Sequence, residues 1–330
     1  MNLKALFAWP LLFCLVLAAA APGSLAASGP AISLRLAELH PADHPTAQAD
    51  YEFARLVDER SRGRIRIAVY TDSALGQEIS VLEQVQFGAI DIARVSLSAV
   101  ASYVPRLNAL QMPYLYRDAD HMWRVLNGEV GRELLASVRD AGFVGLGWFE
   151  AGSRNFYNSR RSVTSPADLK GLRIRVQESQ LMSDIVTALG ARAVQQPFGE
   201  VYSALETGAI DGAENNMPTY FSSQHYKVAR YYTLTEHARI PEIVVGSALG
   251  LASLSPADLE LIRKAAMDAV DFQRKAWDGY EKLAAERVRS AGVVIVSKPD
   301  LGPWKALARR AYELQSPEIR ALVERIRAVK

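Results

Sequence analysis

Residues 255–290 read SPADLELIRKAAMDAVDFQRKAWDGYEKLAAERVRS, and this stretch decides the fold. It opens with a serine at the N-cap, Pro256 at the first helical position and Asp258 at the third, which is typical of a helix start. No further proline occurs before Gly292, where we expect the helix to end. At 1.5 Å per residue such a helix is roughly 50 Å long, which exceeds one small lobe. We therefore expect it to cross between two lobes of a hinged body.

The rest of the chain alternates between strand and helix patterns. Apolar alternation predicts strands at 32–36, 65–69, 90–95, 143–149, 172–176 and, after the long helix, 293–296. Helical spacing predicts helices at 46–60, 75–87, 134–141, 181–189 and 200–206, most of them followed by glycine, and a second SPAD at 165–168 predicts another helix start. This order favours an α/β fold of two lobes with mostly parallel sheets and crossover strands. We assign 27–152 with about 242–280 to the first lobe, and about 153–241 with 281–330 to the second.

The N-terminus predicts export to the periplasm. Lys4 lies in a short positive region, 11–21 are apolar, and Ser24-Leu25-Ala26 supplies small residues for cleavage, so 1–26 form a signal peptide. Cys14, the single cysteine, follows the bulky Phe13, which argues against a lipid anchor. No later segment is long and apolar enough to span a bilayer, so we do not expect a membrane-embedded protein.

Composition and motifs exclude several function classes. The chain is 49% hydrophobic and 22% charged with a net charge of +2, so no basic excess suggests nucleic acid. It has no phosphate-binding glycine loop, no G-x-S-x-G, no H-E-x-x-H and no cysteine nucleophile, and we expect no enzyme and no cofactor. His40 and His44 have the spacing of a helical metal pair, but the neighbouring prolines oppose a helix there, and no metal site is expected. His40 follows the end of a strand, where open α/β sheets place ligands.

Arginines near strand ends suggest an anion site. Arg94 lies near the end of one predicted strand, Arg154 follows another by a Gly-Ser turn, and Arg173 and Arg175 alternate within a third. The planar guanidinium holds a carboxylate by two parallel hydrogen bonds and stays charged when desolvated. For any single arginine, the alternative is an ordinary salt bridge.

Three segments carry a more specific signal: LKGLRIRV at 169–176, FGEVYSAL at 198–205 and GAIDGAENN at 208–216. They resemble the substrate-binding proteins of tripartite ATP-independent periplasmic (TRAP) transporters. LGQE at 75–78 and GAIDI at 88–92 fall in the expected order too, so the resemblance covers nearly the whole mature chain. It implies a two-lobe protein that closes on a small organic acid and delivers it to the transporter's membrane subunits.

The resemblance also implies a set of site residues. Arg175 matches the arginine that pairs with the ligand carboxylate, Asn215 a binding asparagine, and Phe198 an aromatic that packs on the ligand. Core packing is an equal alternative for Phe198. Arg154 matches a loop near the hinge that often carries a second cation, and a salt bridge between the lobes is its alternative.

Within the family the chain looks like the members that bind uronic acids such as glucuronate and galacturonate. The segments that carry this likeness are 38–46, 94–96, 158–161 and 214–226. A uronate presents one carboxylate and a rim of hydroxyls, which suits arginines combined with His40, Glu78 and Asn215. Glu78 has an alternative role as a helix N-terminal acid, and His237 is expected in the core. A C4-dicarboxylate or another organic acid is the alternative ligand, and a secreted enzyme acting on a sugar acid through Glu78 and His40 the alternative class.

Overall fold

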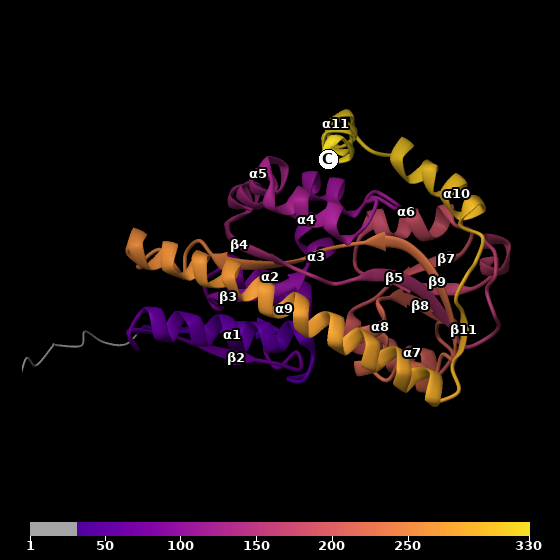
Figure 1. The fold of residues 1–330 in the computed structure, drawn as a ribbon, viewed down its shortest axis with the longest axis horizontal. Coiled ribbons are helices and arrows are strands. Elements are labelled where there is room, and N and C mark those ends of the chain that lie inside the picture. The colour runs from indigo at the N-terminus through magenta and orange to yellow at the C-terminus, as the bar shows by residue number, and fades with distance from the viewer. Residues whose placement is uncertain (1–31) are drawn as a thin grey trace, which may run out of the picture.

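The computed structural model describes residues 32–330 (Figure 1). The predicted signal peptide, its cleavage site after Ala26 and Cys14 lie outside the described residues. The strands form two sheets: β1 Ile32–Glu38, β2 Ile65–Tyr70, β3 Ile92–Ser96, β4 Phe143–Phe149 and β10 Glu242–Ser247 in the first, and β5 Ser153–Asn158, β6 Arg173–Val176, β7 Arg192–Gln195, β8 Gly212–Asn215, β9 Tyr231–Arg239 and β11 Val294–Val296 in the second.

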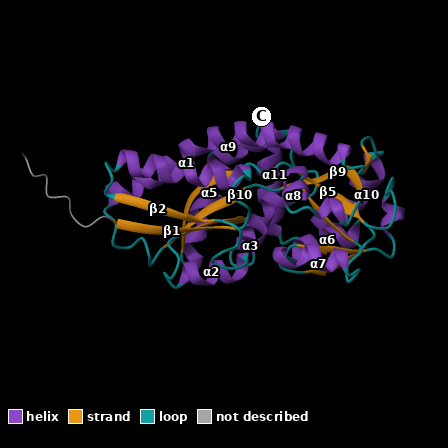
Figure 2. Ribbon diagram, turned by 90° about the horizontal axis from the view of Figure 1, so that it is seen from below, coloured by secondary structure: helices purple, strands orange, loops and turns teal. Residues whose placement is uncertain are grey.

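Helices flank both sheets (Figure 2). The α-helices are α1 Pro45–Arg60, α2 Glu78–Gln86, α3 Leu97–Ala101, α4 Ala119–Asn127, α5 Glu129–Ser137, α6 Gln180–Ala188, α7 Val201–Glu206, α8 Met217–Ser222, α9 Pro256–Ser290, α10 Leu301–Glu313 and α11 Pro317–Ala328. Short 3-10 helices are η1 Pro105–Gln111, η2 Val138–Ala141, η3 Pro166–Leu169, η4 Phe198–Glu200 and η5 His225–Lys227. Within residues 32–330, none of these helices combines the length and the apolar composition needed to cross a membrane.

Both sheets combine parallel and antiparallel pairs. The strand orders are β2-β1-β3-β10-β4 and β11-β9-β5-β8-β6-β7. Within the described chain, five of the nine strand pairs are parallel, as expected from the alternating pattern. Each antiparallel pair includes β5 or β10. Strands β5 and β10 are the first strands after the first two passages between the sheets, whereas β11, which follows the third passage, pairs in parallel with β9.

Helix α9 joins the two halves as the sequence predicts. Ser255 caps its N-terminus by accepting the Asp258 N–H at 3.1 Å, and the helix runs for 35 residues. Its first part contributes Ile262 and Ala266 to the hydrophobic core of the first sheet, and its last part contributes Val288 to that of the second. Figure 2 shows α9 lying across both sheets. Helix α9 thus contributes to both hydrophobic cores. The lobe boundaries given above stay a prediction.

Polar groups connect α9 to the segment between β4 and β5, where the chain first passes from the first sheet to the second. The side-chain amide of Gln273 accepts the N–H of Glu150 at 2.8 Å and donates to its carbonyl at 2.9 Å. The Glu150 carboxylate accepts from Trp123 and from Arg239, which ends β9. Gly152 adopts φ +61°, and a Cβ there would lie 3.1 Å from the ring of the buried Trp277. The crossover therefore packs against α9 closely enough to require glycine.

Three local predictions are corrected. The helix expected at 75–87 begins only at Glu78, because Gly76 has φ +125° and interrupts the pattern. The SPAD at 165–168 does start a helix with a capping box, but η3 lasts four residues and ends before Gly171 at φ +82°. Arg154 does not lie in a loop: it is the second residue of β5, because only three residues separate β4 from β5.

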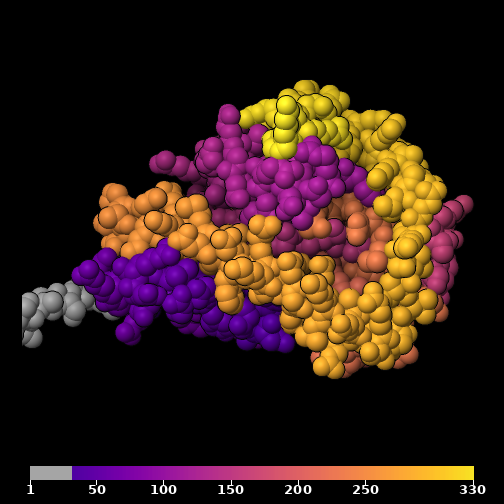
Figure 3. Space-filling model, viewed as in Figure 1, coloured from indigo at the N-terminus to yellow at the C-terminus, as the bar shows by residue number. Residues whose placement is uncertain are grey.

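The C-terminal helices return across the molecule. Helix α10 packs on α6 beside the second sheet, whereas α11 packs on η1 and α5 beside the first. In the space-filling view, the yellow C-terminal residues lie over the purple segment that precedes β4 (Figure 3). The C-terminal segment therefore contacts both halves, and it adds a second bridge besides α9.

Candidate functional site

A narrow cavity, with about 20 Å³ open to water, lies between the sheets, beyond the carboxyl ends of strands β1, β3, β6 and β8. This is where α/β sheets generally bind ligands. Residues from both halves line it: Leu39, His40, Glu78, Arg94, Ser96, Arg154, Arg175, Gln177, Phe198, Asn215, Asn216, Thr219 and Glu242. All seven residues singled out from the sequence are among them. The structure brings them together, and their role in binding stays a prediction.

Arg94 is held on the first-sheet side by two carboxylates. It lies within β3 and only 1% of it is exposed. Its Nε donates to Glu38 Oε2 at 2.6 Å, its Nη2 to the other Glu38 oxygen, and its Nη1 to Glu242 Oε2 at 3.0 Å. These bonds offset the cost of burying the guanidinium. The Arg94 charge is thus already neutralised by neighbouring side chains.

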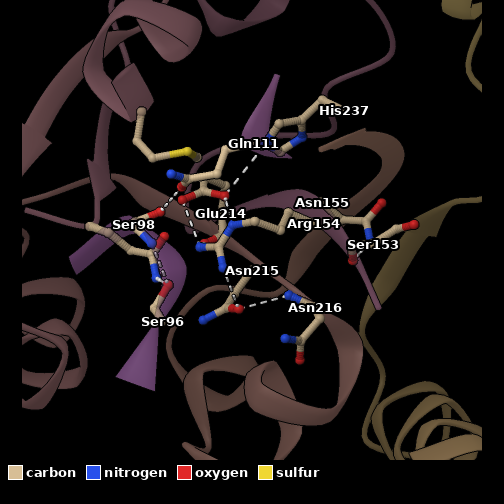
Figure 4. Close-up of polar contacts among 12 residues, drawn as sticks. Ser96, Ser98, Gln111, Ser153, Arg154, Asn155, Glu214, Asn215, Asn216 and His237 are labelled. Carbon is tan, nitrogen blue, oxygen red and sulfur yellow. Dashed lines mark hydrogen bonds and ion pairs between the residues drawn. The ribbon is translucent and has the colours of Figure 1, made fainter. Parts of the chain in front are cut away.

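Arg154 is held in the same way on the second-sheet side (Figure 4). Its Nε and Nη2 donate to the two carboxylate oxygens of Glu214 at 2.5 and 2.8 Å, and its Nη1 donates to Asn215 Oδ1 at 3.2 Å. Burial favours a higher pKa for Glu214, but Arg154 and His237 outweigh it and lower that pKa to about 2. Glu214 therefore stays ionised at neutral pH. Arg154 thus forms a salt bridge, but within one sheet and not between the lobes, as its alternative role would require.

Arg175 differs from the other two arginines. It lies in β6 with 3% exposure, and its Nε donates to the carbonyl of Gln196 at 2.8 Å. Within residues 32–330 it is the one cavity arginine that has no carboxylate within ion-pair distance. Arg173, two residues earlier, is partly exposed and pairs with Asp211 at 2.9 Å. Arg173 and Arg175 share one face of β6, so their positions along the strand separate a partly exposed ion pair from a buried guanidinium that has no carboxylate partner.

Two aromatic rings complete the wall near Arg175. The Arg175 guanidinium carbon lies 6.0 Å from the centre of the Phe198 ring, and the His40 ring meets Phe198 edge-on at 5.6 Å. His40 also stacks on His44 at 3.9 Å. Burial lowers the pKa of His40 to about 3, so the ring is neutral, and its Nδ1 has no partner among the described residues. His44 caps the N-terminus of α1 by accepting the Thr46 N–H.

Glu78 and Asn215 present polar groups to the cavity. Glu78 is the first residue of α2, as its alternative role requires, and its Oε1 accepts the N–H of Ser96 at 2.6 Å. Asn215, at the end of β8, accepts from Arg154 and from the N–H of Asn216 through Oδ1. Its Nδ2 has no hydrogen bond to any residue in the described chain. Asn215 thus offers a donor towards the cavity.

Sequence reasoning missed several lining residues, of which Gln177 is the most informative. It lies just beyond β6, two residues after Arg175, so alternation along the predicted strand would have found it. Its Nε2 donates to Ser96 Oγ at 2.6 Å, which links the two halves. Its Oε1 is buried and has no partner among the described residues. His237, expected in the core, is fully buried and lies 3.4 Å from Glu214.

The described residues contain no cluster of three or more His, Cys, Asp or Glu that would hold a metal ion. A larger surface groove between α10 and α11 lies apart from the cavity and is lined by side chains of both charges, including Lys305, Arg309, Glu313 and Glu324. The cavity between the sheets is the site whose desolvated charges and unpartnered polar atoms converge.

A cavity between two α/β halves, lined from both sides and joined by crossovers, defines a solute-binding protein. The chain belongs to the bacterial extracellular solute-binding proteins of family 7, whose model matches residues 36–317. The expected membership of the TRAP solute-binding proteins is thereby confirmed.

Solved structures and a relative from Escherichia coli agree with this assignment. A TRAP periplasmic solute-binding protein from Bradyrhizobium sp. BTAi1, in complex with α/β-D-galacturonate, is 39% identical with a TM-score of 0.88, and the match covers 89% of this chain and 99% of that one. One from Pseudomonas putida F1 with bound D-glucuronate is 37% identical with a TM-score of 0.88, covering 91% and 98%. The 2,3-diketo-L-gulonate-binding periplasmic protein YiaO of E. coli K12 is 33% identical over 295 residues, 88% of this chain and 87% of that protein.

Proposed function

We propose that this protein binds a uronate, of the D-glucuronate or D-galacturonate class, and that Arg175 holds its carboxylate. The observation that carries the proposal is that Arg175 makes no ion pair in a cavity where Arg94 and Arg154 are already paired. A buried guanidinium whose hydrogen bond goes to a backbone carbonyl is incompletely stabilised, and a ligand carboxylate supplies two charge-assisted hydrogen bonds. The site is built to receive one carboxylate.

The unpartnered polar atoms around Arg175 suit sugar hydroxyls. Asn215 Nδ2 offers a donor and Gln177 Oε1 an acceptor, while neutral His40 offers Nδ1 in either role, depending on its tautomer. A hydroxyl both donates and accepts, so it satisfies each of these groups. Solved relatives with bound galacturonate and glucuronate support the same ligand class.

A C4-dicarboxylate fits the cavity less well. Its second carboxylate needs a second cation, and both remaining arginines are occupied by Glu38, Glu242 and Glu214. To bind a dicarboxylate tightly, the protein would have to break one of these buried pairs, which typically costs about 3–5 kcal/mol. The charge pairing therefore favours a monoanion.

We propose further that the protein acts in the periplasm, delivers its ligand to the membrane subunits of a TRAP transporter, and catalyses no reaction. The family assignment and the predicted export signal at 1–26 support this. An acid–base role for Glu78 and His40 is disfavoured, because a histidine with a pKa of about 3 is a weak base at neutral pH. Incubating purified protein with D-galacturonate and following the sugar by NMR tests this: turnover would contradict the proposal.

Binding is tested by a thermal-shift screen followed by calorimetric titration. Residues 27–330 are titrated with D-glucuronate, D-galacturonate, 2,3-diketo-L-gulonate, sialic acid and succinate at pH 7. A ligand that binds only the folded state raises the melting temperature, and we expect the two uronates to give the largest shifts. Tight succinate binding with no response to either uronate would overturn the proposed ligand class.

A further inference from the structure

The charges around the cavity do not balance in the way an anion-binding site requires. Three guanidinium groups are accompanied by four carboxyl groups from Glu38, Glu78, Glu214 and Glu242. If every group is ionised, the empty cavity carries one net negative charge, and a monoanionic ligand makes it two. In a poorly hydrated space such an excess is strongly unfavourable.

Glu78 is the carboxyl without a cation of its own. Glu38 and Glu214 each make paired bonds to an arginine, and Glu242 accepts from Arg94 at 3.0 Å. Glu78 forms no ion pair with any residue in 32–330, and its bond from the Ser96 N–H engages one carboxyl oxygen. The second oxygen is thus available for a proton.

The groups that face Glu78 come from every neighbouring element. Glu38 and the neutral His40 lie on and just after β1, Arg94 on β3 and Glu242 on β10, while Arg154 and Arg175 face it from β5 and β6. Arg94 and Arg154 already form ion pairs with other carboxylates. Arg175 remains, and it is the group that a ligand carboxylate would neutralise. Once that happens, nothing balances Glu78 except a proton.

Resting on the function proposed above, we propose that Glu78 takes up a proton when the anionic ligand binds, so that the protein captures its ligand together with a proton. The protonated carboxyl then donates a hydrogen bond to a ligand oxygen, which an ionised carboxylate cannot do. Glu78 thereby sets specificity as well as charge balance, because it favours an oxygen acceptor at its position.

The ionisation of Glu78 agrees with this geometry. Burial, and next the carboxylate of Glu242, raise its pKa to about 7, against the bond from Ser96 and the charges of Arg175 and Arg154. In the ligand-free protein Glu78 is thus about half-protonated at neutral pH, and a bound ligand anion raises its pKa further. Asp50 is a second buried acid whose pKa is raised well above the usual range by burial and by Glu242, but it does not line the cavity.

Calorimetry in buffers of different ionisation enthalpy measures the proton directly. D-Glucuronate is titrated into the protein in phosphate and in Tris at pH 7 and pH 8. From the pKa of about 7 we expect uptake of ~0.5 proton at pH 7, rising towards ~1 at pH 8, with a dissociation constant that increases about tenfold from pH 6 to pH 8. Glu78→Gln should abolish the uptake and flatten the pH dependence. Glu83→Gln, on the exposed side of the same helix, should preserve both.

The possible outcomes distinguish a failure of proton uptake by Glu78 from a failure of the proposed function. Absence of any uronate binding to the wild type overturns both. Tight binding with identical heats in the two buffers at pH 7 and pH 8 overturns proton uptake and leaves the function standing. If Glu78→Gln binds and still takes up a proton, another group is the acceptor and the assignment to Glu78 is wrong. The wild-type measurement tests proton uptake without any variant, so the inference can be refuted even if Glu78→Gln folds poorly.

Discussion

Replacing Arg175 with alanine removes the proposed carboxylate partner and should nearly abolish uronate binding. Truncating one member of a buried charge pair costs about 2–5 kcal/mol. The structure favours the upper part of this range, because Arg94 and Arg154 are held by Glu38, Glu242 and Glu214 and cannot replace the lost cation. At about 4 kcal/mol the dissociation constant rises roughly a thousandfold.

Calorimetric titration of D-glucuronate into wild type and variants checks this value, with circular dichroism to confirm folding. Arg175→Lys should recover little affinity, because lysine keeps the charge but loses the planar pair of donors. Arg173→Ala is the matched control: it removes an arginine from the same strand that pairs with Asp211 at the surface, so affinity should change little. If Arg175→Ala binds a uronate as tightly as wild type, the carboxylate lies elsewhere and the central assignment is wrong.

Three further predictions concern stability and motion. Glu214→Gln should cost about 3 kcal/mol in urea unfolding at pH 7, because it leaves Arg154 buried without its counter-ion. The pKa of Glu214 is depressed to about 2, so this stabilisation is present above pH ~4.5 and lost as the pH falls towards 2; a gap between wild type and variant that stays constant down to pH 3 would contradict the ion pair as its source. Gly279→Ala should stabilise the protein by about 1 kcal/mol in thermal or urea unfolding, since Gly279 lies inside α9 and a Cβ there meets nothing within 4 Å; an unchanged melting temperature would argue against this. A saturating uronate should compact the molecule in small-angle scattering, and an unchanged profile would count against closure about a hinge.

Much of the fold could be predicted because its local signals are strong. Proline after serine marks the start of α9, and alternating apolar residues mark β1 and β2. Strand β10 was not predicted: all six residues of EIVVGS are buried, so the alternation between an inner and an outer face disappears. Strand β5, with the sequence SRNFYN, carries no apolar alternation either, so the pattern does not reveal that Arg154 lies in a strand.

The residues of the site could be predicted from the sequence, but their ion-pair partners could not. Arg94, Arg154 and Arg175 look alike as arginines near strand ends. What separates them is the position of Glu38, Glu214 and Glu242, which lie 56, 60 and 148 residues away from the arginines they contact. Such pairings depend on which strands become neighbours in the sheets, and local spacing does not record them. The same applies to Gln273 and Glu150 at the crossover, which are 123 residues apart.

The difference between the arginines explains how a site rich in charge can be selective. Two guanidinium groups are fixed by carboxylates on their own side of the cavity and shape its walls, and Arg154 also holds Glu214 ionised. The third has a backbone carbonyl as its partner and keeps donors for a ligand. Since Arg175 lies on the second-sheet side and Glu78 on the first, a ligand that satisfies both must contact both halves at once. We expect such contacts to stabilise the closed arrangement over an open one, so that recognition of the carboxylate and closure of the cavity are parts of the same binding event.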